Sequence, residues 1–452
     1  MQSRVFIVAN RLPVSAHQTS HGIQFQPSPG GLASALRGVT RNAQAMWVGY
    51  AGVDLHLSEA KMQASGLPKN AIPLQLPADD YDDFYYRVAN GSLWPVFHGF
   101  APRKLYSHAQ WKAFLRVTER FADKLAQLVH SSDIIWVHDY QLCMLPAVLR
   151  KKGIQNKIGF FLHIPFPNVK TLQMIPHYRD ILQSLCAADV TGFQTKHDVT
   201  NFQAALNFAA VPKSHTVLKA LPVGIDYETY AEAHKQPAVR KHATRIFNAH
   251  RGKIVVFSIS RLDYTKGILQ QLDAFERMLK DSDDPGQFVY QLTVAPSREN
   301  LDEYSTMRTQ IERRVTQINT RWQTDGWRPV EFAYRNFPFE EVTAWYLRAD
   351  IMLVSPLKDG MNLIAKEYVA TRPENDGVLV LSKQAGAAEQ LRTALLCEAH
   401  DVESIVSSLQ KAARMTRAQK ERAMSSLRKH VSEYNATAWA ANFLHHLDFE
   451  VK

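Results

Sequence analysis

The sequence lacks any long apolar run. Near the N-terminus only five apolar residues, Val5 to Ala9, precede Asn10 and Arg11. A secretory signal needs a longer apolar stretch after its basic start, and a membrane-spanning helix needs roughly 20 residues. Because neither pattern occurs in the 452 residues, we expect a cytoplasmic protein with no membrane partner.

Cysteine is scarce as well. The three cysteines, Cys143, Cys186 and Cys397, lie far apart and form no CxxC or CxxH pair. This spacing argues against a disulfide framework and a structural zinc site, and it favours a reducing compartment. The patterns GxGxxG, Walker A and GxSxG are also absent, which disfavours a dinucleotide enzyme, a P-loop enzyme and an α/β-hydrolase.

The composition is that of a globular protein, with 46% hydrophobic and 21% charged residues. The net charge is +10, but a nucleic-acid interface would need basic and aromatic residues clustered together. The densest basic stretch, residues 411–429, has helical spacing and predicts the solvated face of a C-terminal helix. We therefore expect no nucleic-acid partner, and the remaining positive charge suits the binding of phosphate anions.

Two series of short apolar runs alternate with amphipathic helical stretches. The runs are residues 4–10, 132–139, 157–164 and 189–195 in the first series and 253–260, 288–296, 330–335, 351–356 and 378–382 in the second. Such strands predict parallel sheets covered on both faces. The sequence thus predicts an α/β protein of two doubly wound, Rossmann-like domains, separated by the polar stretch 226–252. Polar residues that follow the strands are expected at a shared cleft.

Segment 259–267, ISRLDYTKG, places Arg261 and Lys266 on a loop between a strand and a helix. A guanidinium fork and a flexible ammonium at one strand end suit the two phosphates of a diphosphate leaving group. Two solvated loop cations are the simpler alternative.

Segment 355–372, SPLKDGMNLIAKEYVATR, predicts a strand end, a turn at Asp359–Gly360 and a helix. The backbone N–H groups of a helix start bind phosphate oxygens. Glu367, two turns along this helix, is suited to a ribose diol, and Asp359 to sugar hydroxyls. A helix-terminal carboxylate and a surface glutamate are the plainer interpretation, but the turn at a strand end favours binding.

Polar residues also end strands in the N-terminal half of the chain: Arg11, Asp139 in WVHDYQL and His163 in FFLHIPFP. An isolated histidine is more often a core residue, and no second ligand at a suitable spacing makes His163 a metal site.

Two further N-terminal segments are suited to ligands, the first to a phosphate or sugar-nucleotide and the second to a sugar ring and its phosphate. Residues 28–36 predict a glycine turn that opens a helix. Residues 85–95 predict a loop holding Tyr85 and Trp94, whose rings are of the kind that packs on sugars. Taken singly, each of these features is more typical of packing than of binding.

The order of these motifs resembles the trehalose-6-phosphate synthases of glycosyltransferase family 20. The matching segments, spread over residues 9–388, are ANRLP, PGGLASAL, WVGYAG, LWPVFH, WVHDYQL, IGFFLHIPFP, GFQT, RLDYTKG, VAPSRE, SPLKDGMNLIAKEYVA and VLVLSKQAGAA. The resemblance implies a GT-B fold with an acceptor-binding domain (1–228), a nucleotide-sugar-binding domain (229–432) and a last helix (433–452) that returns to the first domain. It implies no metal and no cofactor.

The resemblance also implies the reaction, which is transfer of glucose with retention from a nucleotide-glucose, UDP-glucose being favoured, to glucose 6-phosphate. In this front-face mechanism the leaving diphosphate oxygen accepts the proton of the acceptor hydroxyl, so no enzymic nucleophile is needed. The implied catalytic residues are Asp139, His163, Arg261, Lys266 and Asp359. The implied acceptor-binding residues are Arg11, Tyr85, Trp94, Asp139 and Arg298. The implied donor-binding residues are Gly30, Gly31, Arg261, Lys266, Phe337, Val342, Gly360, Met361, Asn362, Leu363 and Glu367.

The sequence departs from the family pattern at Lys358, at Gln141 and after AGAA, where the usual Asn-Pro is missing. These departures leave open the base of the donor and the fine specificity for the acceptor. Two alternatives stay open: a glucosylglycerol-phosphate synthase that uses glycerol 3-phosphate, and a non-catalytic sensor of sugar phosphates. The sequence does not decide between a monomer and a homo-oligomer such as a dimer or tetramer.

Overall fold

A computed structural model of the chain describes residues 3–19, 22–27, 36, 45–52, 59–212, 215–297 and 302–449. The chain packs as two units. Unit 1 comprises Met1–Val223 and Ala436–Lys452, and unit 2 comprises Gly224–Asn435. The sequence-based boundaries, after residues 228 and 432, lie a few residues from these divisions.

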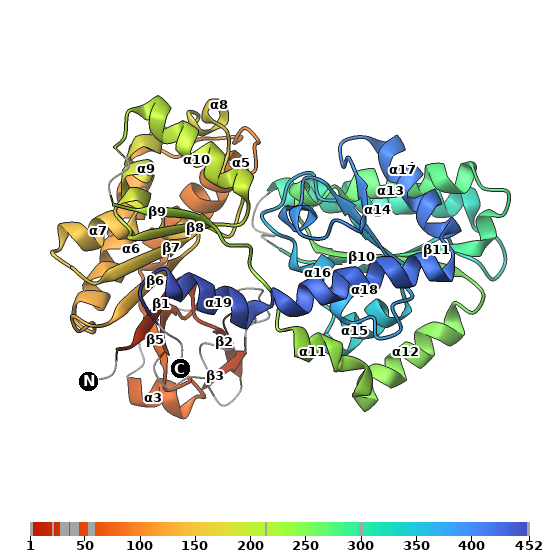
Figure 1. The fold of residues 1–452 in the computed structure, drawn as a ribbon, viewed down its shortest axis with the longest axis horizontal. Helices are drawn as coiled ribbons and strands as arrows, with labels where there is room; N and C mark the ends of the chain where they lie inside the picture. The colour runs from red at the N-terminus through yellow and green to blue at the C-terminus, as the bar shows by residue number, and fades with distance from the viewer. Residues whose placement is uncertain are drawn as a thin grey trace. The chain divides into compact units, whose positions relative to one another are not determined.

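The centre of unit 1 is a seven-stranded parallel sheet with the order β5-β4-β1-β6-β7-β8-β9 (Figure 1). Apolar side chains bury β1, β6 and β8 on both faces, as expected for a sheet covered by helices on each side. The strands are β1 (Val5–Arg11), β4 (Ala45–Tyr50), β5 (Ala71–Leu74), β6 (Ile134–His138), β7 (Lys157–Phe161), β8 (Val190–Phe193) and β9 (Val217–Ala220).

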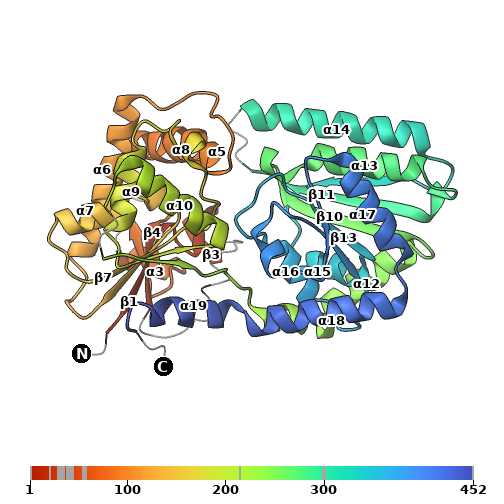
Figure 2. The same ribbon diagram turned by 45° about the horizontal axis from the view of Figure 1, so that its top comes forward.

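The last helix of the chain, α19 (Ala436–His445), belongs to unit 1 and lies against its sheet (Figures 1 and 2). Phe443 of α19 packs where β7 and β8 carry glycines: a Cβ at Gly159 would lie 2.5 Å from its ring and one at Gly192 would lie 2.8 Å from it. Glycine at these two positions therefore makes room for the helix. The other helices of unit 1 are α3 (Glu59–Ala64), α4 (Ala78–Tyr81), α5 (Trp94–Phe97), α6 (His108–Ala126), α7 (Leu145–Lys151), α8 (Val169–Leu172), α9 (Tyr178–Cys186) and α10 (Lys196–Ala209).

The prediction of a loop over residues 85–95 is wrong. These residues lie in a π-helix, Asp82–Leu93, that continues into α5. Its wide turns bring each residue close to the one five positions earlier. Asn90 Nδ2 donates to the Tyr85 carbonyl at 2.8 Å, and a Cβ at Gly91 would lie 2.9 Å from the Tyr86 carbonyl oxygen. A π-helix repeats neither every 3.6 nor every 2 residues, so the usual periodicities do not reveal it.

An antiparallel hairpin, β2 (Val14–Thr19) and β3 (Gly22–Pro27), follows β1 and was not expected from the sequence. Its strands are short and carry few large apolar residues, so they lack the pattern of the buried parallel strands.

The centre of unit 2 is a six-stranded parallel sheet with the order β12-β11-β10-β13-β14-β15. All five strands predicted for this half are present, and the sequence missed only the short edge strand β15. The strands are β10 (Ile254–Arg261), β11 (Phe288–Ala295), β12 (Val330–Tyr334), β13 (Ile351–Val354), β14 (Val378–Ser382) and β15 (Leu395–Cys397).

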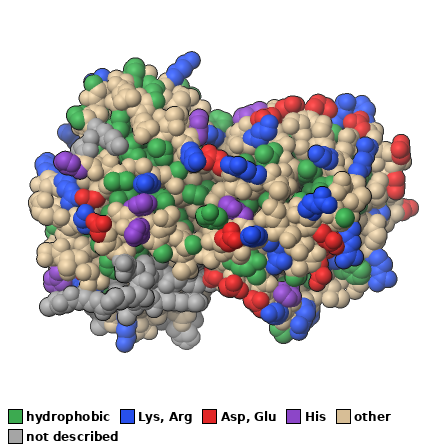
Figure 3. Space-filling model, viewed as in Figure 1, with side chains coloured by type: hydrophobic (Ala, Val, Ile, Leu, Met, Phe, Trp, Pro, Cys, Tyr) green, Lys and Arg blue, Asp and Glu red, His purple; other side chains and the backbone are tan. Residues whose placement is uncertain are grey.

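Helices cover both faces of the unit 2 sheet (Figure 2). On one side lie α13 (Ile268–Lys280), α14 (Asp302–Trp322) and α17 (Val402–Arg414), and on the other lie α15 (Phe339–Arg348), α16 (Leu363–Ala370) and α18 (Arg417–Glu433). The polar stretch 226–252 is mostly helical, forming α11 (Tyr227–Ala231) and α12 (Pro237–Ala249) within unit 2. The basic stretch 411–429 spans the end of α17 and most of α18 rather than a single helix. On the face seen in Figure 3, the Lys and Arg side chains of unit 2 are interspersed with Asp and Glu.

Both sheets reverse their strand order at one point. In unit 1, β1 is followed by β4 on one side and by β6 on the other, and in unit 2, β10 has β11 and β13 as its neighbours. At such a reversal the loops that leave the two central strands diverge, and open α/β sheets bind ligands outside the carboxyl ends of these strands. Ligand-binding residues are therefore expected after β1 and β6 in unit 1 and after β10 and β13 in unit 2.

Candidate functional site

Three of the predicted residues lie at the carboxyl edge of the unit 1 sheet. Arg11 is the last residue of β1, Asp139 follows β6, and His163 lies two residues beyond β7. Because β1, β6 and β7 are adjacent and parallel, the sheet brings these residues to one edge, as the sequence predicted.

Asp139 holds the loop after β6 in an unusual backbone conformation. Its φ is 73°, in a region that costs a non-glycine residue about 1–3 kcal/mol. Hydrogen bonds hold it there: its N–H donates to the Phe161 carbonyl at 2.8 Å, its carbonyl accepts from the Leu142 N–H at 3.1 Å, and its Oδ1 accepts from the His163 N–H at 3.2 Å. The carboxylate therefore braces the turn that carries His163.

His163 is half-buried and contacts a second histidine. Its Nε2 lies 3.1 Å from Nδ1 of His138, which is fully buried. Its carbonyl accepts a hydrogen bond from Gln194 Nε2 at 3.3 Å. Burial lowers the pKa of His163 to about 3, so the ring is neutral at physiological pH.

Arg11 points its guanidinium over two tyrosine rings. Its Nε donates to Tyr81 Oη at 3.3 Å, its Cζ lies 5.6 Å from the centroid of Tyr85, and these two rings stack on each other at 5.3 Å. Aromatic faces hold a guanidinium and leave its outer N–H groups able to donate. Arg11 is exposed, so this fork is available to an anion such as a phosphate.

The structure separates the roles of the two predicted aromatic residues. Tyr85 is half-buried beneath Arg11. The side chain of Trp94 packs into the interior instead, with 5% of its surface exposed and its ring 4.0 Å from that of His98. Trp94 is therefore mainly a core residue that supports the π-helix.

In unit 2, the centre of the candidate site is the ion pair of Lys266 and Asp359. Lys266 Nζ lies 2.7 Å from Asp359 Oδ2, and only 11% and 16% of the two side chains are exposed. Asn362 Nδ2 donates to the same carboxylate oxygen at 2.9 Å. Lys266 follows β10 and the other two follow β13, so all three stand at the reversal of the strand order.

The two loops that carry these residues are joined by their backbones. The Leu357 N–H donates to the Thr265 carbonyl at 2.7 Å. Gly267 has a φ of 67°, and a Cβ there would lie 2.6 Å from the Ser355 carbonyl oxygen. Glycine is thus required by both the backbone conformation and the close approach of the loops.

The start of α16 faces this arrangement. Asn362 is the N-cap residue, with a φ of 70°, and its side chain accepts from the Ala365 N–H at 3.4 Å. The sequence expected the turn at Asp359–Gly360 and a helix from Met361, whereas the left-handed residue is Asn362 and the helix begins at Leu363. N–H groups in the first turn of a helix are of the kind that binds anions, so the change of one or two residues in the helix start leaves the sequence-based expectation in place.

Glu367 lies a little more than one turn into α16 rather than two. Its Oε2 accepts from Tyr346 Oη at 3.0 Å, and Tyr230 also hydrogen-bonds it. Burial raises the pKa of Glu367, and the two tyrosines act against that rise. The carboxylate is thus held in place by hydroxyl donors from α11 and α15, and it is not an ordinary surface glutamate.

The remaining predicted residues of unit 2 come from several elements. Arg261 is the exposed last residue of β10. Phe337 is half-buried, with the Arg335 guanidinium 4.1 Å from its ring centroid, and Val342 is half-buried in α15. Gly360 and Met361 are buried, and the Met361 carbonyl accepts from the Ala387 N–H at 2.9 Å. Gly30, Gly31 and Arg298, together with the segment 28–35, lie outside the described residues.

Sequence reasoning missed a buried polar chain beneath Lys266. Tyr290 Oη lies 2.6 Å from Ser258 Oγ and donates to Gln271 Oε1 at 2.9 Å, and Gln271 Nε2 donates to the Lys266 carbonyl at 3.1 Å. Ser258 and Gln271 line a small cavity with Lys266 and Asn362. The polar residues stand inside apolar strand and helix patterns, which give no signal of what they contact.

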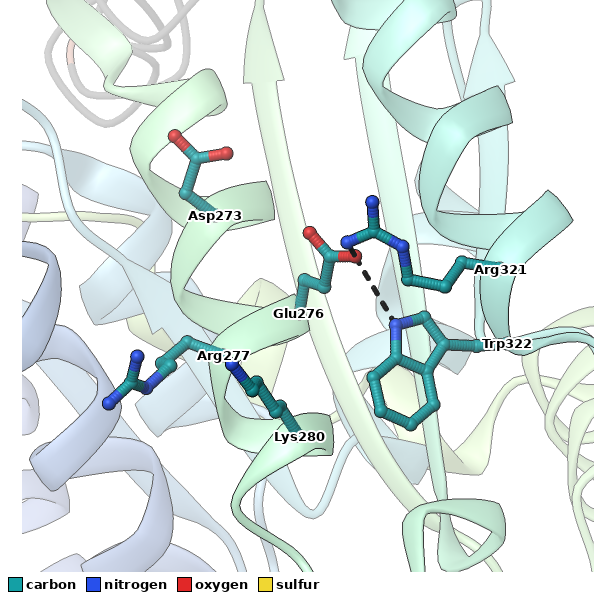
Figure 4. Close-up of a pocket in the computed structure, with 6 residues that line it drawn as sticks. All are labelled: Asp273, Glu276, Arg277, Lys280, Arg321 and Trp322. Atoms are coloured by element: carbon teal, nitrogen blue, oxygen red, sulfur yellow. Dashed lines mark hydrogen bonds and ion pairs between the residues drawn. The ribbon is translucent and has the colours of Figure 1, made fainter.

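A hollow larger than this cavity lies elsewhere in unit 2, between α13 and α14 (Figure 4). Its side chains already pair with one another: Glu276 accepts from Arg321 at 2.7 Å and from Trp322 Nε1 at 3.3 Å. Its α13 residues, Asp273 to Lys280, lie roughly 8–18 Å along the helix from its start at 1.5 Å per residue, and so away from Lys266.

Among the described residues, no helix is long and apolar enough to cross a membrane. In the same part of the chain, no group of three His, Cys, Asp or Glu side chains is arranged to hold a metal ion.

Comparison with known proteins identifies relatives over the whole chain. The sequence model of glycosyltransferase family 20 matches residues 3–448. The trehalose-6-phosphate synthase of Mycobacterium sp. (strain KMS) is 35% identical over 460 residues, covering 97% of this chain and 94% of that protein. The bifunctional trehalose-6-phosphate synthase/phosphatase of Thermoproteus tenax is 32% identical over 468 residues, covering 98% of this chain but only 63% of that protein. The chain thus spans less than two thirds of the bifunctional relative.

Solved structures match with similar coverage. The UDP-forming α,α-trehalose-phosphate synthase from Burkholderia xenovorans, in complex with glucose-6-phosphate, has a TM-score of 0.89 and 30% identity, covering 99% of this chain and 100% of that one. A structure from E. coli bound with UDP-2-fluoro glucose has a TM-score of 0.88 and 30% identity, with the same coverage. Both units are therefore Rossmann-like domains of a GT-B fold, as predicted. The chain belongs to glycosyltransferase family 20, and it is a glycosyltransferase.

Proposed function

We propose that this enzyme transfers glucose, with retention of configuration, from a nucleotide-glucose to glucose 6-phosphate and so forms trehalose 6-phosphate. UDP-glucose is the favoured donor. The observation that carries the proposal is the group of Lys266, Asp359 and Asn362 at the strand reversal of unit 2, beside the start of α16. The similarity to synthases throughout the chain supports the same reaction.

Unit 2 has the chemistry that a nucleotide-sugar needs. Lys266, Arg261 and the N–H groups at the start of α16 suit the diphosphate, because cations and a helix start both stabilise phosphate charge. Glu367, held by Tyr346 at 3.0 Å, suits the two ribose hydroxyls as a fixed acceptor. Asp359 suits hydroxyls of the transferred glucose.

Unit 1 has the chemistry that a hexose phosphate needs. Arg11, supported by Tyr81 and Tyr85, suits the phosphate through bidentate hydrogen bonds. Asp139 holds its carboxylate at the same sheet edge and suits the hydroxyl that becomes glycosylated. In this proposal Tyr85 acts mainly by supporting Arg11, and Trp94 acts only through packing.

The proposed reaction needs no enzymic nucleophile. The bond between glucose C1 and the diphosphate oxygen breaks, and the acceptor hydroxyl forms its bond to C1 on the same face. The hydroxyl proton passes to the departing diphosphate oxygen, so both charges and atoms balance. Lys266 and the α16 start stabilise the negative charge that develops on that oxygen, which is the largest contribution such a site makes.

The proposal is tested by a matrix of donors and acceptors. UDP-, ADP- and GDP-glucose are each combined with glucose 6-phosphate or glycerol 3-phosphate, and release of the nucleoside diphosphate is measured. We expect the highest kcat/KM with UDP-glucose and glucose 6-phosphate. NMR of the product should show α linkages at both anomeric carbons. A β linkage at the anomeric carbon of the transferred glucose would refute retention.

Other outcomes of this matrix identify the alternatives. Higher activity with glycerol 3-phosphate would replace the proposal by a glucosylglycerol-phosphate synthase. Sugar-phosphate binding by calorimetry without turnover of any donor would favour a non-catalytic sensor.

A further inference from the structure

The hydrogen bond between His138 and His163 restricts where the protons of both rings lie. The facing atoms are Nδ1 of His138 and Nε2 of His163, 3.1 Å apart. Burial lowers the pKa of each ring, so both are neutral and each carries one N–H. A hydrogen bond at this distance requires that one of the two facing nitrogens carries its proton and the other does not.

Two arrangements satisfy this condition. In the first, His138 donates from Nδ1, its own Nε2 is a bare lone pair, and the proton of His163 sits on Nδ1. In the second, His163 donates from Nε2, the proton of His138 sits on Nε2, and Nδ1 of His163 is bare. The two arrangements thus present opposite hydrogen-bonding groups at the outer nitrogen of His163.

The surroundings of His138 Nε2 distinguish them. This atom is buried and has no hydrogen-bond partner among the described residues. The second arrangement would place a buried N–H donor there, and orphaned N–H groups are the rarer and more costly kind.

Two indole rings next to His138 strengthen the distinction. The rings of Trp136 and Trp439 lie 4.7 Å and 6.4 Å from the His138 ring, and both indole N–H groups are buried without an acceptor in the described part of the chain. This cluster already has more donors than acceptors. A bare Nε2 on His138 supplies a lone pair to it, whereas a third N–H would add to the excess.

From this we propose that His138 is a positioning residue that fixes His163 as the Nδ1–H tautomer, so that His163 presents a hydrogen-bond donor to a substrate oxygen. No hydrogen-bond partner of His163 Nδ1 is found among the described residues, and the His163 side chain is half-buried, whereas Nε2 of His138 is fully buried. The backbone of His163 is held on both sides, by Asp139 and Gln194, so the donor has a fixed direction. The identity of the oxygen, on the transferred sugar or its phosphate, rests on the proposed function.

The tautomer is measured directly by NMR. The protein is labelled with ¹⁵N-histidine, and long-range ¹H–¹⁵N correlations report which ring nitrogen carries the proton; the His163 signal is assigned by its loss in His163→Gln. We expect a protonated Nδ1 and a bare Nε2 at neutral pH without substrate. A protonated Nε2, or a charged ring, would overturn the proposal.

A matched pair of variants tests whether His138 sets the tautomer. His138→Phe keeps a ring in the core but removes the hydrogen bond, and Trp136→Phe alters the same cluster without touching that bond. We expect His163 to move to the Nε2–H form or to a mixture only in His138→Phe. An unchanged His163 signal in His138→Phe, or the same change in Trp136→Phe, would contradict the assignment; if His138→Phe does not fold, the wild-type spectrum decides.

Kinetics separate this proposal from the proposed function. In His138→Phe the KM for UDP-glucose should rise about tenfold, the factor for one lost hydrogen bond, with little change in the KM for glucose 6-phosphate. An Nδ1–H tautomer in a protein with no synthase activity would refute the reaction and leave the tautomer standing. Full activity with an Nε2–H tautomer would do the opposite.

Discussion

Lys266 Nζ and Asp359 Oδ2 form a 2.7 Å ion pair between the loops that follow β10 and β13. Each loop leaves a strand on one side of the reversal in the unit 2 sheet. A cation fixed there has its position set by two strands at once, which is the kind of preorganisation that stabilises charge in a transition state.

Replacing Lys266 should therefore remove catalysis and leave the fold. In Lys266→Ala we expect kcat to fall about 10²–10³-fold, because one donor to the developing charge is lost. Circular dichroism and thermal unfolding should stay close to wild type, since Asn362 still donates to Asp359. The control is Lys280→Ala, an exposed cation at the end of α13, which should retain full activity. Near-normal turnover of folded Lys266→Ala would refute the role of this ammonium.

The architecture around this pair was predictable, and its contacts were not. Continuous apolar runs such as β10 and β13 identify parallel strands, and polar residues after them identify the carboxyl edge. Local pattern could place Lys266 and Asp359 on neighbouring loops. It could not show that they pair with each other, because 93 residues separate them and the pairing depends on the strand order.

Other features were hidden for different physical reasons. The π-helix over Asp82–Leu93 has no periodicity that a helix or strand template detects, so Tyr85 and Trp94 were expected in a loop. The environment of Glu367 depends on Tyr346, which reaches it from another helix. The role of His138 depends on a tautomer, which follows from burial and partners and not from residue type.

Glu367 should lower the stability of the fold at neutral pH and strengthen binding of the donor. Its folded-state pKa is raised by burial, so the folded state holds a proton more tightly than the unfolded state. Stability therefore falls as the pH rises through the window from the ordinary glutamate value of 4.5 to the raised value. Glu367→Gln removes this loss and should unfold at a higher temperature than wild type at pH 7, with the gap closing below pH 4.5.

The same substitution should weaken binding of the nucleotide-sugar. We expect the KM for UDP-glucose to rise about tenfold, because a carboxylate accepts ribose hydroxyls more strongly than an amide does. The KM for glucose 6-phosphate should stay constant. Differential scanning fluorimetry over the pH range and steady-state kinetics check the two halves; a Glu367→Gln variant less stable than wild type at pH 7 would contradict the expected direction.

Arg11 should not be replaceable by lysine. Its guanidinium lies over Tyr85 and donates to Tyr81, and a lysine ammonium provides neither the stacking plane nor the bidentate fork. In Arg11→Lys we expect the KM for glucose 6-phosphate to rise about tenfold to a hundredfold, with the KM for UDP-glucose little changed. Arg116→Lys is the control, because its exposed ion pair with Asp80 is of the kind that contributes little. Equal effects of the two substitutions would contradict a specific phosphate contact.

Gly267→Ala tests the close approach of the Lys266 loop to the Asp359 loop, and Gly326→Ala is its control. Gly267 and Gly326 both have positive φ, 67° and 77°, so alanine costs each about 1–2 kcal/mol of backbone strain. Only at Gly267 does the added Cβ also meet an atom, the Ser355 carbonyl oxygen at 2.6 Å, whereas nothing lies within 4 Å of it at Gly326. Chemical unfolding should show a larger loss for Gly267→Ala than for Gly326→Ala. The KM for the donor should rise about tenfold in Gly267→Ala alone. The clash moves the Lys266 loop away from the Asp359 loop, and misplacing the groups of a preorganised anion site weakens it. If the two variants lose the same stability and the same activity, the close approach of these loops does not matter for the site, and strain at a positive φ is enough to explain both.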